Sequence, residues 1–196
     1  MNVLPFALYL FAVFIIGVLV YSRDVWITLQ QINPYVLGGL GCALSISMSI
    51  FGASWGIFTA GSSIAGASVQ APHIRSKNLI SIIFCEAVAI YGIIMAIIQT
   101  SKMEHHDDIF QMHPTGLSFS HQTIVSGYLI FCSGLTIGFG TLACGISIGV
   151  LGSACAIGDA AKSSLFIKFL IMEIFASAFG IFALIIAILQ VQAAKF

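Results

Sequence analysis

The chain has 196 residues, of which 59% are hydrophobic and only 7% are charged. A soluble domain carries about 25% charged residues, so this composition excludes a soluble globular protein and leaves little of the chain outside a membrane. Lys plus Arg and Asp plus Glu both number 7, so the bulk charge indicates neither a nucleic acid nor an acidic surface as a partner. No part is large enough for a separate soluble catalytic domain, and we expect no catalytic residue, no cofactor and no metal.

The first apolar stretch covers residues 4–20 and ends in a polar segment that contains Arg23 and Asp24. It lacks the basic start of a signal peptide and is long for the apolar core of one. It therefore predicts a first transmembrane helix that remains attached. Pro34 suits the start of the next helix, so we assign residues 1–33 to an extra N-terminal helix and its connection.

The second predicted helix covers residues 35–70 and is unusually rich in small side chains. Its length, about 54 Å if it is wholly helical, would carry it beyond the bilayer. Small residues recur at steps of four in two neighbouring stripes, one of Gly41, Ser45, Ser49 and Ala53 and the other of Gly52, Gly56 and Ala60. Apolar burial does not drive helices together in lipid, so this spacing predicts close contact between helix backbones.

One carboxylate, Glu86, lies inside the next apolar stretch, residues 79–98, which holds no other charge. These twenty residues would span about 30 Å, the thickness of the hydrocarbon core, so Glu86 is expected at membrane depth. A charge at the centre of a transmembrane helix costs about 2.5–3.5 kcal/mol, and such residues usually mark ion or proton pathways. The alternative is a protonated Glu that only joins helices by a hydrogen bond.

A polar segment, residues 101–121, separates the first hairpin (34–100) from the second (122–196). It contains His105, His106 and His113 together with acidic residues, but their spacing matches no closed set of metal ligands, so we interpret it as a solvated loop. The helix that follows repeats the small-residue pattern at Gly145 and Gly149 and at Ser153. A short turn leads to the last predicted helix, residues 165–191.

A shift of 91 residues superimposes the second and third predicted helices on the fourth and fifth. The fold class is therefore an all-α membrane protein with five transmembrane helices, an N-terminal helix followed by two tandem hairpins in the same orientation. The shift places Glu86 on Ser177 and not on Glu173. Glu173 lies one turn earlier, so we expect it to face nearly the same way as Ser177, but at a shallower depth. A small excess of basic residues places the hairpin turns in the cytoplasm.

These features together resemble the proteolipids of the V-type (vacuolar) proton ATPases, from the membrane V0 sector. The resemblance covers about residues 34–192 and is carried by the motifs at 52–61, 68–72, 84–92, 145–152 and 175–180. The resemblance implies that the glycines of these motifs pack helices together. They are Gly52, Gly56, Gly61, Gly145, Gly149 and Gly152. The extra N-terminal helix, the carboxylate in the first hairpin and Ser177 in the second are similar to the c double-prime branch of this family.

The resemblance implies a ring that contains other proteolipids of the c type, turned by ATP hydrolysis in a separate soluble sector of vacuolar, other endomembrane or plasma-membrane complexes. Glu86 would take up a proton and release it beside the static a-type subunit, while the d-type subunit would couple the ring to the central stalk. Burial in lipid favours a neutral carboxyl, and an arginine of the a-type subunit would favour the anion. Glu173 would be a secondary buried carboxylate. Two alternatives stay open, a small secondary transporter and a non-transporting membrane scaffold.

Overall fold

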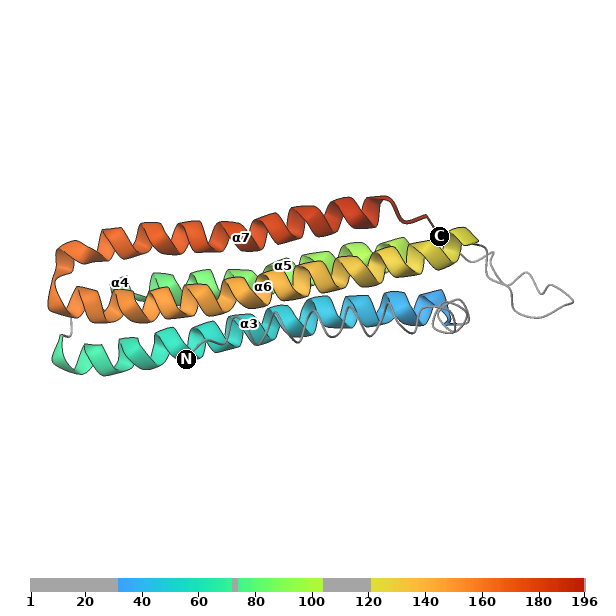
Figure 1. Ribbon diagram of the computed structural model, residues 1–196. Helices are drawn as coiled ribbons and strands as arrows, with labels where there is room; N and C mark the ends of the chain where they lie inside the picture. Colours follow the sequence, from blue (N-terminus) through green and yellow to red (C-terminus); the bar gives the residue numbers. More distant parts are fainter. Residues whose placement is uncertain (1–31, 72–73, 104–120, 196) are drawn as a thin grey trace, which may run out of the picture. The chain divides into compact units, whose positions relative to one another are not determined.

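The computed structural model describes residues 32–71, 74–103 and 121–195, and all regular structure in them is helical (Figure 1). The elements are α3 (Pro34–Gln70), α4 (Ile74–Lys77), α5 (Leu79–Met103), α6 (His121–Ala161), the 3-10 turn η1 (Ser163–Leu165) and α7 (Phe166–Gln192). Together they belong to one compact unit, Pro34–Phe196. The description below concerns this unit alone.

Four of these helices, α3, α5, α6 and α7, are long and apolar enough to cross a membrane. The prediction of five transmembrane helices is therefore wrong, because the described residues hold four, arranged as the two hairpins α3–α5 and α6–α7. The fifth helix rested on the stretch 4–20, whose length is at the lower limit of about 17 residues for a span. That stretch, like most of the polar loop, lies outside the described residues.

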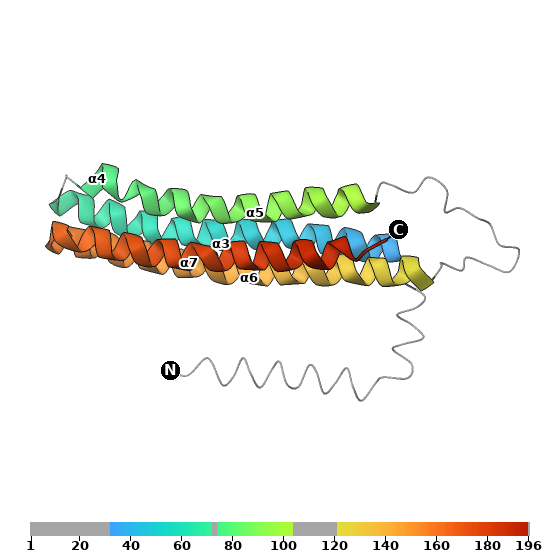
Figure 2. The same cartoon turned by 90° about the horizontal axis from the view of Figure 1, so that it is seen from above.

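The two long helices α3 and α6 pack side by side and run in the same direction. α5 packs on α3, α7 packs on α6, and α5 also contacts both α6 and α7 (Figures 1 and 2). We call α3 and α6, which pack against each other, the inner helices, and α5 and α7 the outer helices. The two hairpins have the same orientation, as the internal repeat predicts.

Glycines allow the backbones of α3 and α6 to touch. A Cβ atom on Gly52 would lie 2.7 Å from the Cα of Leu142, and one on Gly56 would lie 2.5 Å from the backbone oxygen of Gly145. A Cβ on Gly149 would meet the backbone of Gly56, and real Cβ atoms essentially never come within 3.0 Å of such atoms. Only glycine fits at these positions, because any side chain would push the two helices apart.

Hydroxyl groups add polar contacts along the same boundary. The Oγ of Ser49 and the Oγ1 of Thr141 lie 2.6 Å apart, as do the Oγ atoms of Ser63 and Ser153. In lipid such bonds contribute about 0.6 kcal/mol each on average, so close packing of the backbones remains the main term.

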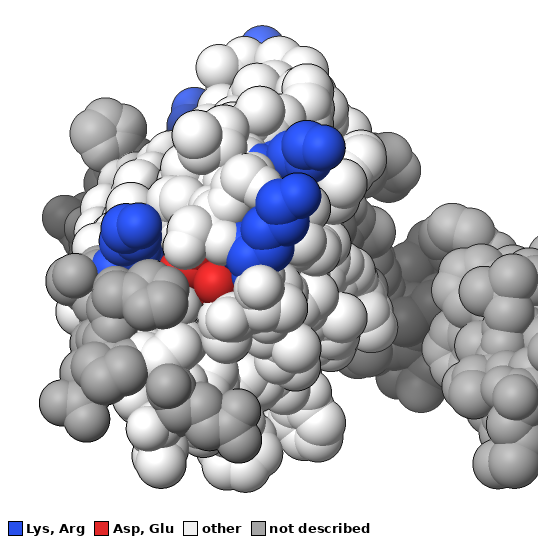
Figure 3. All heavy atoms as spheres, turned by 90° about the vertical axis from the view of Figure 1, so that its left-hand side faces the viewer, with Lys and Arg blue, Asp and Glu red and all other residues white. Residues whose placement is uncertain are grey.

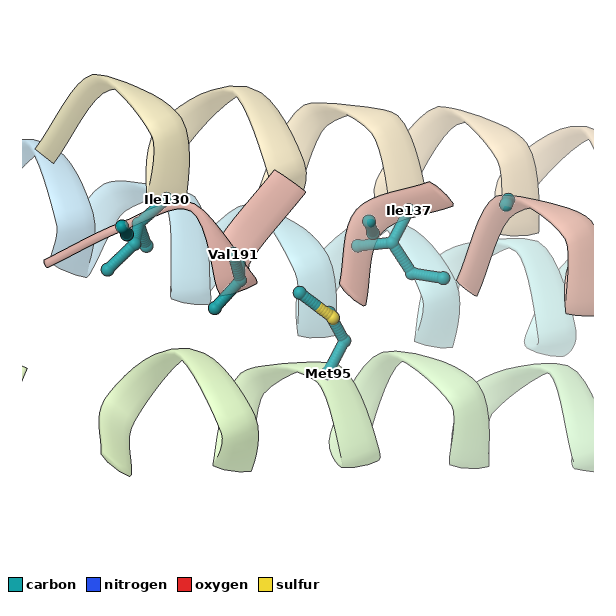
Figure 4. Close-up of a cluster of buried hydrophobic side chains, with 7 residues drawn as sticks. Met95, Ile130, Ile137 and Val191 are labelled. Carbon is teal, nitrogen blue, oxygen red and sulfur yellow. The ribbon is translucent and has the colours of Figure 1, made fainter. Parts of the chain in front are cut away.

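The outer helices close the unit through two apolar clusters. In the first, Met95 of α5 meets Ile130 and Ile137 of α6 and Val191 of α7 (Figure 4). In the second, Val88 of α5 lies among buried residues of all four long helices. α6 is thus covered on one side by the outer helix of its own hairpin and on another by the outer helix of the first hairpin.

Basic side chains gather at the end of the unit where the two hairpin turns lie. Lys77, Lys162 and Lys168 are exposed there, and Figure 3 shows this end with its blue side chains around a small acidic spot. Asp159, next to the second turn, is 1% exposed. Lys77 and Lys162 lie outside the candidate spans, and Lys168 lies near the start of the last one, so all three lysines can reach water or lipid headgroups.

Candidate functional site

Glu86 lies on the outward face of α5 and is exposed on the surface of the unit. Its neighbours on that face, one to three turns away, are exposed isoleucines: Ile83, Ile90 and Ile97. The opposite face, including Cys85 and Val88, is buried against the other helices. The periodicity of α5 therefore places a single carboxylate in an apolar stripe that faces away from the other described helices.

Glu86 forms no hydrogen bond or ion pair with the described part of the chain. The outward position explains this, because the polar groups of α3 and α6 lie behind the helix. A carboxyl in this place can meet groups outside this unit. It can therefore change partners as its surroundings change, which a carboxylate fixed within the chain cannot do.

Glu173 has the opposite environment, because its side chain is 0% exposed. Its Oε1 accepts a hydrogen bond of 2.8 Å from the Oγ of Ser81, and its Oε2 is buried without a partner in the described residues. We expected Glu173 to face nearly the same way as Ser177, but Glu173 is fully buried whereas Ser177 is half-buried. The rotation of one helical turn, about 40°, separates a carboxylate inside the unit from a hydroxyl at its edge.

Ser177 is the residue that the repeat pairs with Glu86. Its Oγ donates a hydrogen bond of 2.8 Å to the backbone oxygen of Ile174, within α7 itself. The structure therefore does not bring Glu86, Glu173 and Ser177 together. It separates them into an outward carboxylate, an inward carboxylate and a locally satisfied hydroxyl.

The packing glycines of the motifs have three different surroundings. Gly52, Gly56, Gly145 and Gly149 lie between α3 and α6, and Gly152 faces α5, where its Cβ would lie 2.8 Å from the Cβ of Ser81. Gly61 differs, because nothing within 4 Å surrounds the position of its Cβ.

Two buried polar groups near the hairpin turns were missed by sequence reasoning. Asn78 donates through Nδ2 to the Oδ2 of Asp159 at 3.2 Å, and the Sγ of Cys155 donates to the Oδ1 of Asn78 at 3.3 Å. The partners are 81 and 77 residues apart in the sequence, so no local pattern could reveal them. They join the start of α5 to the end of α6.

Gln99 was also missed as a site residue, although the repeat aligns it with Gln190. Its Oε1 accepts from the Oγ of Ser45 at 3.2 Å, and its Nε2 donates to the Oγ of Ser133 at 2.8 Å and to the backbone oxygen of Ile130 at 3.3 Å. One amide thus bridges the inner helices of both hairpins. The repeated Gln was the signal that could have identified it.

Comparison with known proteins gives a family. The sequence profile of the ATP synthase C subunit matches residues 40–99 and again residues 131–190, two stretches that begin 91 residues apart. The chain is 46% identical over 174 residues to the c''2 subunit of the V-type proton ATPase of Arabidopsis thaliana, covering 89% of this chain and 94% of the relative. It is 46% identical over 162 residues to the c'' subunit of the V-type proton ATPase of Saccharomyces cerevisiae, covering 83% and 73%. The chain belongs to the V-type proton ATPase proteolipid family.

More distant members of the family are similar over nearly the same region. The c-type proteolipid of the V-type proton ATPase of Candida tropicalis is 30% identical over 152 residues, which cover 78% of this chain and 86% of the relative. The higher identity to the c'' proteins agrees with the branch that the motifs indicate.

Membership in this family confirms the predicted function class. The chain is a proton-translocating V0 proteolipid, and it is not the part of the ATPase that catalyses ATP hydrolysis. It is an integral, multi-pass protein of vacuolar or other endomembranes, in agreement with the four long apolar helices. Membership also implies that it forms a ring with other V0 subunits.

Proposed function

We propose that Glu86 is the proton-carrying residue of this proteolipid. The observation that carries the proposal is its position as the single carboxylate on an outward, otherwise apolar face of a membrane-spanning helix. Because α5 turns this face away from the other described helices, the carboxyl can meet a partner outside the unit. That access is what a carrier on a moving ring requires.

Two opposing effects, desolvation and Coulomb attraction, would control uptake and release of the proton at Glu86. Next to lipid, desolvation favours the neutral carboxyl, so Glu86 keeps its proton while the ring turns. Next to a cation, Coulomb attraction favours the carboxylate, so the proton leaves. We assign the cation to an arginine of the static a-type subunit, and we assign coupling to the central stalk to the d-type subunit.

Glu173 is not a carrier in this proposal. It lies inside the unit and is held by Ser81, so an outside cation cannot reach it without separating the helices. Each copy of the chain would therefore contribute one transported proton, through Glu86. Glu173 would instead help to hold α7 against α5.

The proposal keeps the sequence-based division of the chain. Residues 34–100 form the first hairpin and 122–196 the second, with 1–33 before the first hairpin and the polar segment 101–121 between the two. The work of proton transfer then falls to the first hairpin, while the second supplies helix packing.

A matched pair of variants tests the proposal in the assembled ATPase. Glu86→Gln removes the titratable group but keeps the size and polarity of the side chain, so ATP-driven proton uptake into vesicles should stop although the complex assembles. Glu86→Asp should keep part of the uptake, because the carboxyl remains but is one methylene shorter. Glu173→Gln is the control and should pump at close to the normal rate. Normal uptake by fully incorporated Glu86→Gln, or arrest by Glu173→Gln in an assembled ring, would contradict the proposal.

A further inference from the structure

The helix α5 exposes Glu86 on one side and forms polar bonds to other helices on its buried side. Asn78, which directly precedes α5, bonds to α6, and Ser81 in its first turn bonds to α7. Near the other end of the helix, Gln99 bonds to both α3 and α6. Between Ser81 and Gln99, the buried side chains of α5 are all apolar or small. The polar bonds therefore lie near the two ends of the helix, and Glu86 lies between them.

Apolar burial does not determine which side of α5 faces the other helices. Lipid tails are as apolar as Ile83 and Ile90 on its exposed side, so turning these side chains inward would lose little in apolar transfer. A polar group that turns from its partner towards lipid loses its bond, and an unpaired polar group in an apolar surrounding is costly. Close packing and polar bonds therefore fix the rotation of α5 about its axis.

Asn78 is held through both ends of its amide. Its Nδ2 donates to the Oδ2 of Asp159 at 3.2 Å and to the backbone oxygen of Ile74 at 3.3 Å. Its Oδ1 accepts from the Sγ of Cys155 at 3.3 Å. The side chains of Asn78, Asp159 and Cys155 are each at most 1% exposed. The start of α5 is thus fixed to the end of α6, which belongs to the second hairpin.

The anchor at Asn78 lies close enough to Glu86 to control its direction. Eight residues separate the two, which is about two helical turns and about 12 Å along the axis. Five residues separate Ser81 from Glu86, about 140° around the helix, so the bonded side and the carboxylate point in different directions. Because consecutive turns are joined by backbone hydrogen bonds, a rotation at the start of α5 also turns Glu86. A freed start would let Glu86 turn towards the other helices.

The repeat shows that this anchor is not a general feature of the hairpins. The equivalent of Asn78 in α7 is Phe169, which has no polar group in its side chain. The equivalent of Asp159 in α3 is Ser68, whose Oγ donates to a backbone oxygen of its own helix. Within the described residues, the anchor therefore belongs to the outer helix that carries Glu86.

The anchor requires a buried acid at the end of α6. The Oδ1 of Asp159 is buried and has no hydrogen-bond partner in the described residues. A buried carboxyl with an unpaired oxygen is costly, so apolar packing alone does not explain an acid at this place. What the acid contributes in the structure is its bond to Asn78.

We propose that Asp159 is a positioning residue for proton transfer. By holding Asn78 at the start of α5, it fixes the side of the helix on which Glu86 lies. The inference rests on the proposed function, in which Glu86 carries the proton. Asp159 and Asn78 do not touch that proton, but they give the second hairpin a part in its transfer. Ser81 adds a single bond beside this anchor, so loss of that bond alone leaves Glu86 in place.

Variants of Asp159 in the intact ATPase separate the hydrogen bond from the charge. The readouts, each per assembled complex, are ATP-driven proton uptake and the initial rate at which a hydrophobic carbodiimide modifies Glu86. Asp159→Ala removes the acceptor, so both rates should fall severalfold. Asp159→Asn keeps a carbonyl that accepts from Asn78, so both rates should stay close to those of the wild type. Ser68→Ala, at the equivalent position of the first hairpin, is the matched control and should change neither rate.

A double-mutant cycle tests whether the two residues act through one bond. Asn78→Ala removes the donor and should slow modification of Glu86 as much as Asp159→Ala does. The double variant should be no slower than either single variant, because the bond is already lost. If Asp159→Ala does not assemble, the comparison of Asn78→Ala, which should be slow, with Ser81→Ala, which should be normal, decides the question. Wild-type rates in assembled Asp159→Ala or Asn78→Ala would overturn the proposal, as would an Asp159→Asn variant as slow as Asp159→Ala.

The modification rate also separates this inference from the proposed function, because it reports how Glu86 faces whether or not Glu86 carries a proton. Slow modification in Asp159→Ala together with normal pumping by Glu86→Gln would contradict the proposed function alone. Unchanged modification in Asp159→Ala together with arrest by Glu86→Gln would contradict the inference alone.

Discussion

Substitution of Gly56 by Ala provides a sensitive test of how α3 and α6 pack. The new Cβ would lie 2.5 Å from the backbone oxygen of Gly145 and 2.9 Å from the Sγ of Cys85. A carbon atom needs about 3.5 Å from such neighbours, so the helices must separate locally by about 1 Å. Because the atom opposed is backbone, no side-chain rotation can relieve the contact.

Two opposing effects determine how much Gly56→Ala changes the free energy of unfolding. Replacement of Gly by Ala within a helix gains about 1 kcal/mol of helix stability, whereas overpacking a close contact costs about 1–3 kcal/mol. We expect Gly56→Ala to lower the free energy of unfolding by up to about 2 kcal/mol. Gly66→Ala is the control, since nothing lies within 4 Å of its Cβ position, and it should gain about 1 kcal/mol.

Unfolding by SDS in mixed micelles, followed by circular dichroism, measures both variants. We expect Gly56→Ala to unfold at a lower SDS fraction than the wild type and Gly66→Ala at a higher one. If Gly56→Ala is as stable as Gly66→Ala, the two backbones do not touch there and the argument from close packing fails.

Three further outcomes follow from the buried polar contacts and the repeat. Gln99→Met loses three hydrogen bonds. At about 0.6 kcal/mol for each bond, it should lower the free energy of unfolding in the same SDS assay by about 2 kcal/mol. A change below the error of the assay would show that these bonds do not stabilise the chain. Ser81→Ala removes one bond to Glu173 and should cost about 0.6 kcal/mol, with proton uptake unchanged; a loss of uptake would place that bond in the pathway. The double variant Glu86→Gln with Ser177→Glu returns a carboxylate to the repeat-equivalent depth, and some proton uptake there, with none in Glu86→Gln alone, would show that depth is the requirement.

The hairpins and the glycine contacts could be predicted because their causes are local in the sequence. Apolar length predicts each span, and glycines at steps of four predict a close contact wherever two such helices meet. The 91-residue repeat relates the two hairpins and predicts their common orientation. These features need no knowledge of which helix becomes the neighbour.

Which polar side chains of a helix are buried could not be predicted, because this depends on which side of the helix its neighbours cover. Glu173 and Ser177 differ by only about 40° around α7, yet one is buried and the other lies at the edge of the unit. The contact between Asn78 and Asp159 joins residues 81 positions apart. Both depend on how the hairpins pack against each other, and the sequence of a single helix does not determine this packing.

Labelling of the intact ATPase with a hydrophobic carbodiimide tests the central claim most directly, because such reagents attack protonated carboxyls within the membrane. The site of modification on this chain is mapped by mass spectrometry and compared with ATP-driven proton uptake by the same vesicles. We expect modification of Glu86, no modification of the buried Glu173, and no uptake once Glu86 is modified in every copy. Undiminished uptake with every copy of Glu86 modified would contradict it.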